Sequence, residues 1–168
     1  SGKIKFLVND LLMHIKPLAP VFLPINKYGS QAKESSLQIN NAYESDEQML
    51  IFPAGLCSRL QHGKIKDLEW KKTFIAKAVQ SQRDIIPIYF EGRNSTFFYR
   101  FAQIRKCIGL KFNIELIYLP DEMFNSKNKT FDIYIGKPIP WQTFDKSKSL
   151  QEWAQIVKEK VYQIKKNQ

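Results

Sequence analysis

The fold is decided by residues 48–59, which read QMLIFPAGLCSR. Residues 48–52 predict a buried strand that runs into a Pro-Ala-Gly turn. Glycine lets the backbone approach a ligand closely, and Arg59 can grip a phosphate or carboxylate through two parallel hydrogen bonds. We therefore expect a ligand-binding edge at this strand end. An ordinary strand-ending turn with a surface arginine is the alternative.

Strands and helices alternate along the rest of the chain. The predicted strands cover residues 3–8, 20–25, 84–90 and 131–135. The predicted helices cover residues 9–16, 31–43, 67–82, 95–107 and 149–165, and their N-caps include Asp67 and Ser149. This alternation is typical of one α/β domain over residues 1–168, with a largely parallel sheet flanked by helices. Ligands of such sheets bind beyond the carboxyl ends of the strands, where FPAG lies.

The composition points to a polyanionic partner. The 168 residues carry a formal net charge of +10, which suits nucleic acid, anionic lipid or a phosphorylated substrate. The two cysteines, Cys57 and Cys107, lie in no metal-binding motif, so no zinc site is expected. No apolar run reaches the roughly 20 residues that span a bilayer.

Residues 93–111 interleave aromatic and basic side chains. On a short helix this mixture suits a membrane interface, where rings settle at the headgroups and cations meet anionic lipid. It also suits single-stranded nucleic acid, which combines stacking with phosphate contacts. A third interpretation places the aromatic rings in the core and the cations on a solvated face, and the sequence leaves all three open.

FPAGLCSR resembles the third sequence block of the glycerolipid (lysophosphatidate-type) acyltransferase family, whose usual form is Phe-Pro-Glu-Gly-Thr-Arg-Ser. Residues 84–88, DIIPI, resemble the fourth block, and residues 20–27, PVFLPINK, resemble the second. The likeness extends to about Pro140 and is strongest to a bacterial branch labelled hemolysin. That branch includes enzymes that O-acylate lyso-ornithine or lyso-glycine lipids.

The resemblance implies a set of substrate-binding residues. Ala54 replaces the usual glutamate of the third block, the arginine moves to position 59, and Lys27 stands in for an arginine of the second block. These departures leave the acceptor open and argue against plain glycerol phosphate chemistry. The residues expected to bind substrate are Lys27, Phe52, Pro53, Gly55, Ser58 and Arg59.

His62 and Asp67 have the spacing of the family's catalytic His-x4-Asp block. In that block the histidine deprotonates the acceptor and the aspartate orients the imidazole ring. The family places it before the second block, whereas His62 and Asp67 follow the third. We interpret the pair as a decoy made of a turn at Gly63 and a helix cap, and His14 as a surface histidine. The catalytic block is therefore expected outside this chain, which would not turn over alone.

The resemblance implies transfer of a fatty acyl group from acyl carrier protein or coenzyme A to a lysophospholipid or lyso-aminolipid. Neither a metal nor a bound cofactor is expected. The protein would be cytoplasmic and peripheral to the inner membrane, with an anionic membrane surface as its partner. The alternative is a non-catalytic basic module that binds anionic membrane or nucleic acid.

Overall fold

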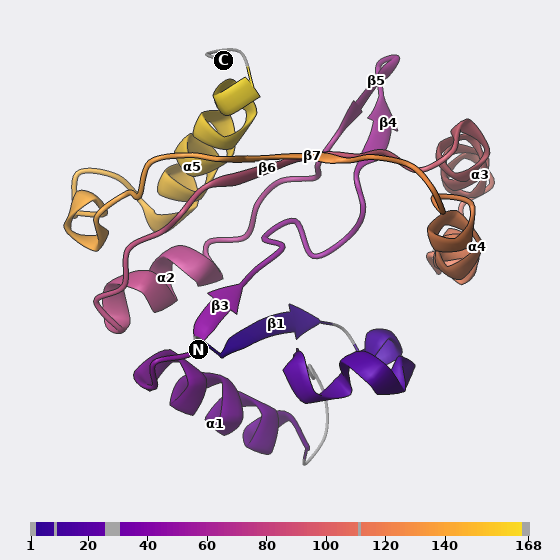
Figure 1. The fold of residues 1–168 in the computed structure, drawn as a ribbon. Helices are drawn as coiled ribbons and strands as arrows, with labels where there is room; N and C mark the ends of the chain where they lie inside the picture. Colours follow the sequence, from indigo (N-terminus) through magenta and orange to yellow (C-terminus); the bar gives the residue numbers. More distant parts are fainter. Residues whose placement is uncertain (1–2, 9, 26–30, 111, 166–168) are drawn as a thin grey trace.

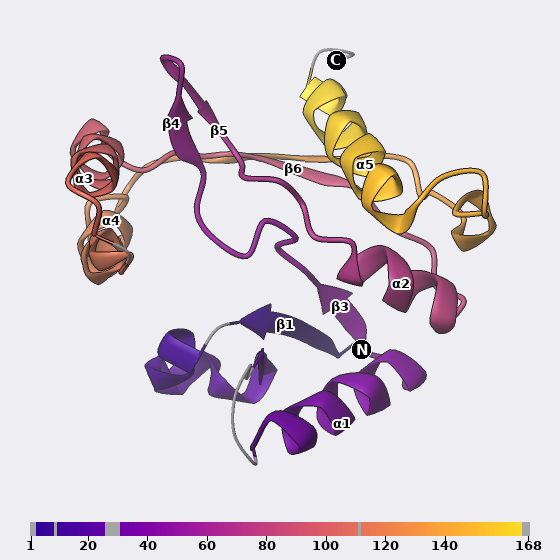
Figure 2. The same cartoon turned by 180° about the vertical axis from the view of Figure 1, so that it is seen from behind.

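A computed structural model describes residues 3–8, 10–25, 31–110 and 112–165 (Figures 1 and 2). Its first part is a three-stranded parallel sheet with the strand order β2-β1-β3. The strands are β1 (Ile4–Val8), β2 (Phe22–Pro24) and β3 (Gln48–Leu50). Phe6 of β1 is in register with Phe22 on one side and Leu50 on the other. The parallel sheet confirms the predicted α/β fold.

Short helices connect these strands. The 3-10 helices η1 (Asp10–His14) and η2 (Lys16–Val21) separate β1 from β2, and α1 (Gln31–Glu44) precedes β3. His14 is exposed in the last turn of η1, as predicted for a surface histidine.

The remaining strands pair in antiparallel fashion, which the sequence did not indicate. A tight hairpin joins β4 (Arg59–Gln61) to β5 (Lys64–Lys66). Its two-residue turn, His62 and Gly63, has φ values of 48° and 74°, the left-handed pattern that matches the twist of a hairpin. The second pair is β6 (Ile88–Glu91) with β7 (Asp132–Ile135).

The predicted helix start at Asp67 is wrong. Helix α2 covers Thr73–Gln80, and its N-cap position is Lys72. The Asp67 carboxylate is used elsewhere, because it accepts hydrogen bonds from Ser58 Oγ at 2.5 Å and from Trp70 Nε1 at 3.1 Å. These contacts hold residues 67–70 outside the helix.

Helices α2 and α5 (Leu150–Ile164) pack together over the core. Ile75 of α2 and Ala154 of α5 are fully buried there, with Val157 beside them. The predicted cap of α5 is confirmed, since Ser149 and Glu152 form a reciprocal capping box.

The far end of the molecule holds α3 (Thr96–Cys107), η3 (Ile114–Tyr118) and α4 (Leu119–Phe124) (Figure 1). Ser95 caps α3 by accepting a hydrogen bond from the Phe98 amide. Phe98 and Tyr99 are buried, whereas Phe97 is 55% exposed, so the aromatic segment divides between core and surface. A last short helix, η4 (Trp141–Thr143), precedes α5.

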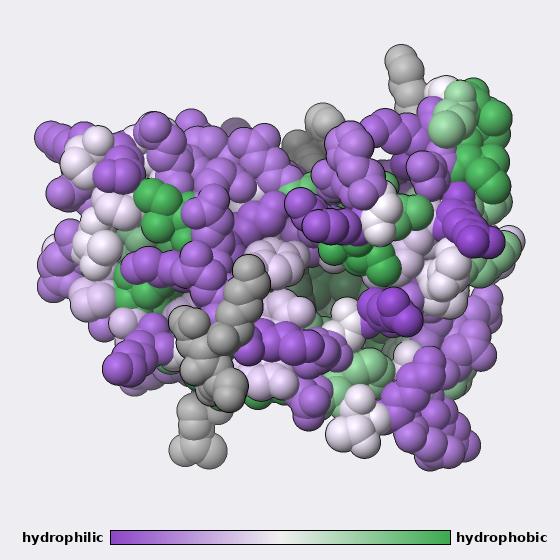
Figure 3. Space-filling model, turned by 90° about the horizontal axis from the view of Figure 1, so that it is seen from above, coloured by the Kyte–Doolittle hydropathy of each residue, from purple (hydrophilic) through white to green (hydrophobic). Residues whose placement is uncertain are grey.

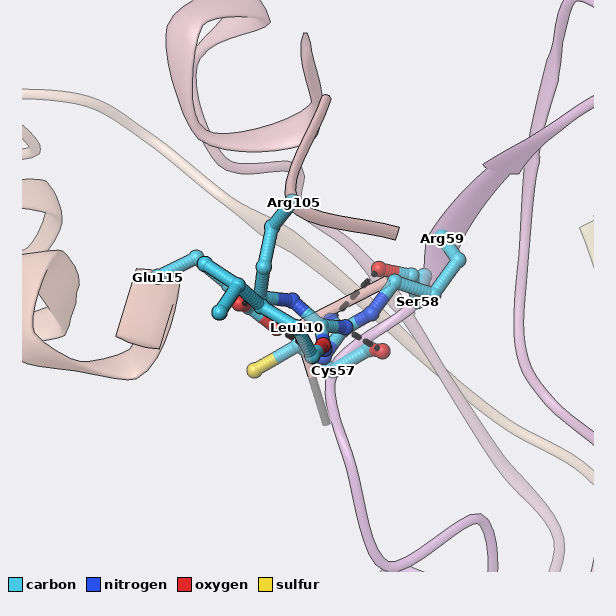
Figure 4. Close-up of polar contacts among 6 residues, drawn as sticks. All are labelled: Cys57, Ser58, Arg59, Arg105, Leu110 and Glu115. Atoms are coloured by element: carbon cyan, nitrogen blue, oxygen red, sulfur yellow. Dashed lines mark hydrogen bonds and ion pairs between the residues drawn. The ribbon is translucent and has the colours of Figure 1, made fainter. Parts of the chain in front are cut away.

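A buried carboxylate joins this end to the hairpin (Figure 4). Glu115 of η3 is fully buried; its Oε1 accepts a hydrogen bond from Arg59 Nη2 at 2.6 Å, and its Oε2 lies 2.9 Å from Arg105 Nε. Arg105 also donates to the Leu110 carbonyl at 2.6 Å. One buried charge therefore ties β4, α3 and η3 together.

We expect Glu115→Gln to lower the free energy of unfolding by about 3 kcal/mol, since removing one partner of a buried ion pair leaves the other charges uncompensated. Urea unfolding followed by circular dichroism measures the change. Glu159→Gln, on the exposed side of α5, is the matched control and should change stability by less than about 0.5 kcal/mol. Equal effects of the two substitutions would show that the Glu115 pairs are not structural.

Candidate functional site

The FPAG turn follows β3 and closes on itself. Gly55 N donates to the Phe52 carbonyl at 3.0 Å, and Gly55 has a φ of 68°, a left-handed conformation that favours glycine. Ala54 is buried in the α2–α5 core, while the Phe52 side chain is 64% exposed. The turn therefore exposes the Phe52 ring next to the Gly55 backbone, while Ala54 anchors it in the core.

A lysine covers this turn that the sequence did not single out. The Lys71 backbone N–H donates to the Pro53 carbonyl at 3.1 Å. A Cβ atom added at Gly55 would lie 3.0 Å from Lys71 Nζ, so the glycine leaves room for the ammonium group. Lys71 is exposed and places a positive charge at the carboxyl end of β3.

Arg59 is held by internal partners. Besides Glu115, its guanidinium donates to the carbonyl of Cys57 at 2.9 Å (Figure 4). The guanidinium also lies 6.0 Å from the centre of the Phe98 ring. The side chain is only 13% exposed. Arg59 and Arg105 together exceed the charge of Glu115 by one unit, so the group stays positive near the turn. Binding of an acceptor by Arg59 stays a prediction.

Ser58 and Asp67 anchor the segment that follows the hairpin. Besides the bonds from Ser58 and Trp70, the Asp67 backbone N–H contacts the Tyr162 hydroxyl at 3.4 Å. Burial, and then the neighbouring Asp67 charge, raise the pKa of Tyr162 to about 12. The structure therefore brings Ser58 and Asp67 together, whereas His62 lies at the hairpin tip and donates no hydrogen bond to Asp67.

The other candidate residues fall as follows. Lys27 lies outside the described residues. Pro53 lines a large hollow between β3 and the segment that leads into β6. Burial raises the pKa of the Cys57 thiol, which keeps it protonated and a poor nucleophile at neutral pH.

The sequence analysis did not single out Glu115, and it counted Arg105 only among the basic residues of the segment 93–111. A single acidic residue inside the apolar run IELIYL was the available signal, since a charge among buried residues requires a partner. Lys71 gave no such signal, because it follows a tryptophan in an otherwise ordinary polar stretch.

No three His, Cys, Asp or Glu side chains in residues 3–8, 10–25, 31–110 and 112–165 gather in a way that could hold a metal ion. Over the same residues, every helix is too short or too polar to cross a membrane.

Comparison with known proteins identifies relatives over nearly the whole chain. A lyso-glycine lipid O-acyltransferase of Bacteroides thetaiotaomicron is 57% identical over 164 residues, which cover 98% of this chain and 60% of that relative. The enzyme of the same name from Phocaeicola vulgatus is 54% identical over 164 residues and 59% of its length is covered. The chain thus spans well under two thirds of these curated relatives.

No solved structure matches the chain. The family model described as Acyltransferase matches residues 1–168. Because this match covers every residue, the chain belongs to the acyltransferase family.

Proposed function

We propose that this chain forms the substrate-facing part of an enzyme that acylates a lysolipid, with a lyso-glycine lipid as the acceptor. The observation that carries the proposal is the 57% identity to a lyso-glycine lipid O-acyltransferase over 98% of the chain. The acyl donor is a thioester of acyl carrier protein or coenzyme A. Both donors are anionic, which suits a chain of net charge +10.

The reaction exchanges one acyl bond for another. A general base takes the proton of the acceptor hydroxyl, the oxygen attacks the thioester carbonyl, and the thiolate leaves as the new ester forms. Among the described residues, His62 at the hairpin tip has no hydrogen bond to an aspartate, and His14 ends η1 far from FPAG in the sequence. We therefore assign the base to residues that this chain does not contain.

This chain contributes positive charge at the FPAG turn. A glycine headgroup can present a carboxylate and a lysophospholipid a phosphate, and either anion can pair with the Lys71 ammonium above Gly55. Arg59 acts behind it, because its bonds to the Cys57 carbonyl and to Glu115 fix the chain that leaves the turn.

The surface of α3, η3 and α4 is suited to an anionic bilayer. Large apolar side chains that are at least half exposed gather there: Phe97, Ile104, Ile108, Phe112, Ile117, Met123 and Phe124. Exposed cations accompany them: Arg93, Arg100, Lys106, Lys127 and Lys129. Figure 3 shows apolar and hydrophilic groups side by side at this end of the molecule. We call these two sets the α3–α4 surface.

Lipid suits the α3–α4 surface better than nucleic acid. The rings of Phe97, Phe101 and Tyr118 pack on one another, with centroids 5.4 to 5.8 Å apart, so each ring already has aromatic neighbours. Bases need free ring faces to stack on, whereas a headgroup region accepts aliphatic side chains such as Ile104 and Ile108. Contact with the membrane would bring a lysolipid acceptor to the enzyme.

We expect Lys71→Ala to raise the KM for the lyso-glycine lipid about tenfold, which corresponds to the loss of one charge-assisted hydrogen bond. The assay uses a chimera in which this chain replaces the matched part of the Bacteroides thetaiotaomicron relative. Lys72→Ala, at the exposed neighbouring position, is the control. Equal KM values for the two variants would remove Lys71 from the acceptor site.

His62→Ala in the same chimera should retain kcat within about twofold, because a hairpin-tip residue away from the reacting atoms contributes no proton transfer. Acyl transfer from radiolabelled acyl thioester measures the rate. If the variant is folded by circular dichroism but inactive, His62 is the general base and our assignment is wrong.

The doubly substituted chain Ile104→Asp/Ile108→Asp should lose at least about tenfold in binding to phosphatidylglycerol vesicles, because two apolar anchors become acidic. Co-sedimentation of the chain itself gives the bound fraction. Leu37→Asp, at a residue of α1 that is 61% exposed, is the matched control and should bind like the wild type. Undiminished binding by the double variant would exclude the α3–α4 surface, and preferential binding to single-stranded DNA would favour the basic-module alternative.

A further inference from the structure

A hollow of about 1260 Å³ lies between the parallel sheet and the β6–β7 pair. One wall is formed by residues 48–51, which include β3, and the other by residues 84–88, which lead into β6. Phe74 of α2 and Val157 of α5 close it on the helical side. The hollow therefore separates two groups of strands that share one layer of helices.

The strand edges on both sides of the hollow are open. Among the described residues, β3 pairs only with β1 and β6 only with β7. Ile51 follows β3 and Ile86 precedes β6. The backbone N–H and C=O groups of these two residues have no hydrogen-bond partner within the described part of the chain. The preceding Ile85 exchanges both of its bonds with Ile139, at 2.9 and 2.8 Å, so Ile86 points its polar groups the other way.

Both edges already pack on the same helices. Ile51 and Ile85 contact the core cluster that includes Phe74 and Val157. Two strands that rest side by side on one helical layer normally belong to one sheet. In this structure the hollow lies between β3 and the segment that leads into β6, at the position where a sheet would have another strand.

One face of the β6–β7 pair is apolar and uncovered. Tyr89 and Tyr134 lie on the face toward α5, where the Tyr89 ring is 5.8 Å from that of Tyr162. The opposite face carries Ile88 across from Ile135 and Phe90 across from Ile133, with exposures of 38 to 65%. When one face of an antiparallel sheet is exposed to water, the side chains on that face are normally polar. The apolar side chains here indicate a face suited to contact with another part of a protein.

We infer that an extended apolar segment enters the hollow and pairs with the open edges next to Ile51 and Ile86, joining both groups of strands into one sheet. The occupant is a segment from the part of the acyltransferase that the curated relatives contain outside the match. This chain covers 60% and 59% of the two relatives, so a large part of each is available to supply it. Neighbouring strands of a sheet lie about 4.7–4.9 Å apart, and a strand in the hollow would take up the free N–H and C=O groups on both sides.

Other occupants satisfy the hollow less well. A fatty acyl chain would match the apolar side chains but would leave the backbone groups of Ile51 and Ile86 without partners, which is costly once water is excluded. A second copy of this chain would bring another net charge of +10 against the first. An inserted strand matches the apolar side chains of the hollow and also pairs with the backbone groups of Ile51 and Ile86.

Hydrogen–deuterium exchange tests the inference. In the chimera with the Bacteroides thetaiotaomicron relative, the amides of Ile51 and Ile86 should exchange at least about tenfold more slowly than in this chain alone. The full-length relative, measured at its matching residues, provides the same reading if the chimera fails to fold. Equal exchange in the short and long proteins would overturn the inference.

Two variants separate the backbone from the side chain. In the chimera, Ile86→Pro removes the N–H that the new strand needs, so it should lower Tm more than Ile86→Ala, which retains that N–H. In this chain alone the two variants should have similar Tm values, because the Ile86 N–H has no hydrogen-bond partner among the described residues. Equal Tm values in the chimera would contradict strand insertion.

The rival occupants are tested on this chain alone. Added palmitate, or an increase in protein concentration, should leave the exchange of the Ile51 and Ile86 amides unchanged. Protection by palmitate would assign the hollow to an acyl chain. Protection that rises with concentration, together with a dimer in analytical ultracentrifugation, would assign it to a second copy, and either result overturns the inference.

Discussion

The buried carboxylate of Glu115 is the constraint on which the arrangement of the site depends. Its charge is fully removed from solvent, so Arg59 and Arg105 must stay within hydrogen-bonding distance of it. Arg59 lies at the start of β4, four residues after Gly55 of the FPAG turn, and Arg105 lies near the end of α3. The same interaction therefore sets the exit of the turn and the position of the helix that carries the α3–α4 surface.

Local signals in the sequence were sufficient for some elements and insufficient for others. The capping box at Ser149 and Glu152 is decided within four residues, so pattern alone predicts it. Asp67 has the same propensity, but Ser58 and Trp70 use its carboxylate instead. Arg59 and Glu115 are 56 positions apart, and no local periodicity reports such a contact.

The position of Ala54 explains one departure from the family pattern. Its side chain is buried against the core that contains Trp70 and Phe74, where removing a carboxylate from water would be costly. In this chain the position serves packing, and the charge at the turn comes from Lys71 above Gly55. The sequence showed that the glutamate was missing, but only the three-dimensional arrangement shows which residue supplies charge nearby.

The α3–α4 surface and the hollow beside β6 are formed by neighbouring parts of the chain, since β6 leads into α3 and α4 leads back to β7. They nevertheless differ in the groups that accompany them. The α3–α4 surface is surrounded by exposed cations and has its backbone satisfied within helices, which suits lipid headgroups. The hollow beside β6 has open backbone groups, which lipid cannot satisfy and a strand can. Because Pro53 of the FPAG turn lines this hollow, a strand inserted there would bring residues from outside this chain to the turn, where the mechanism we propose requires a general base.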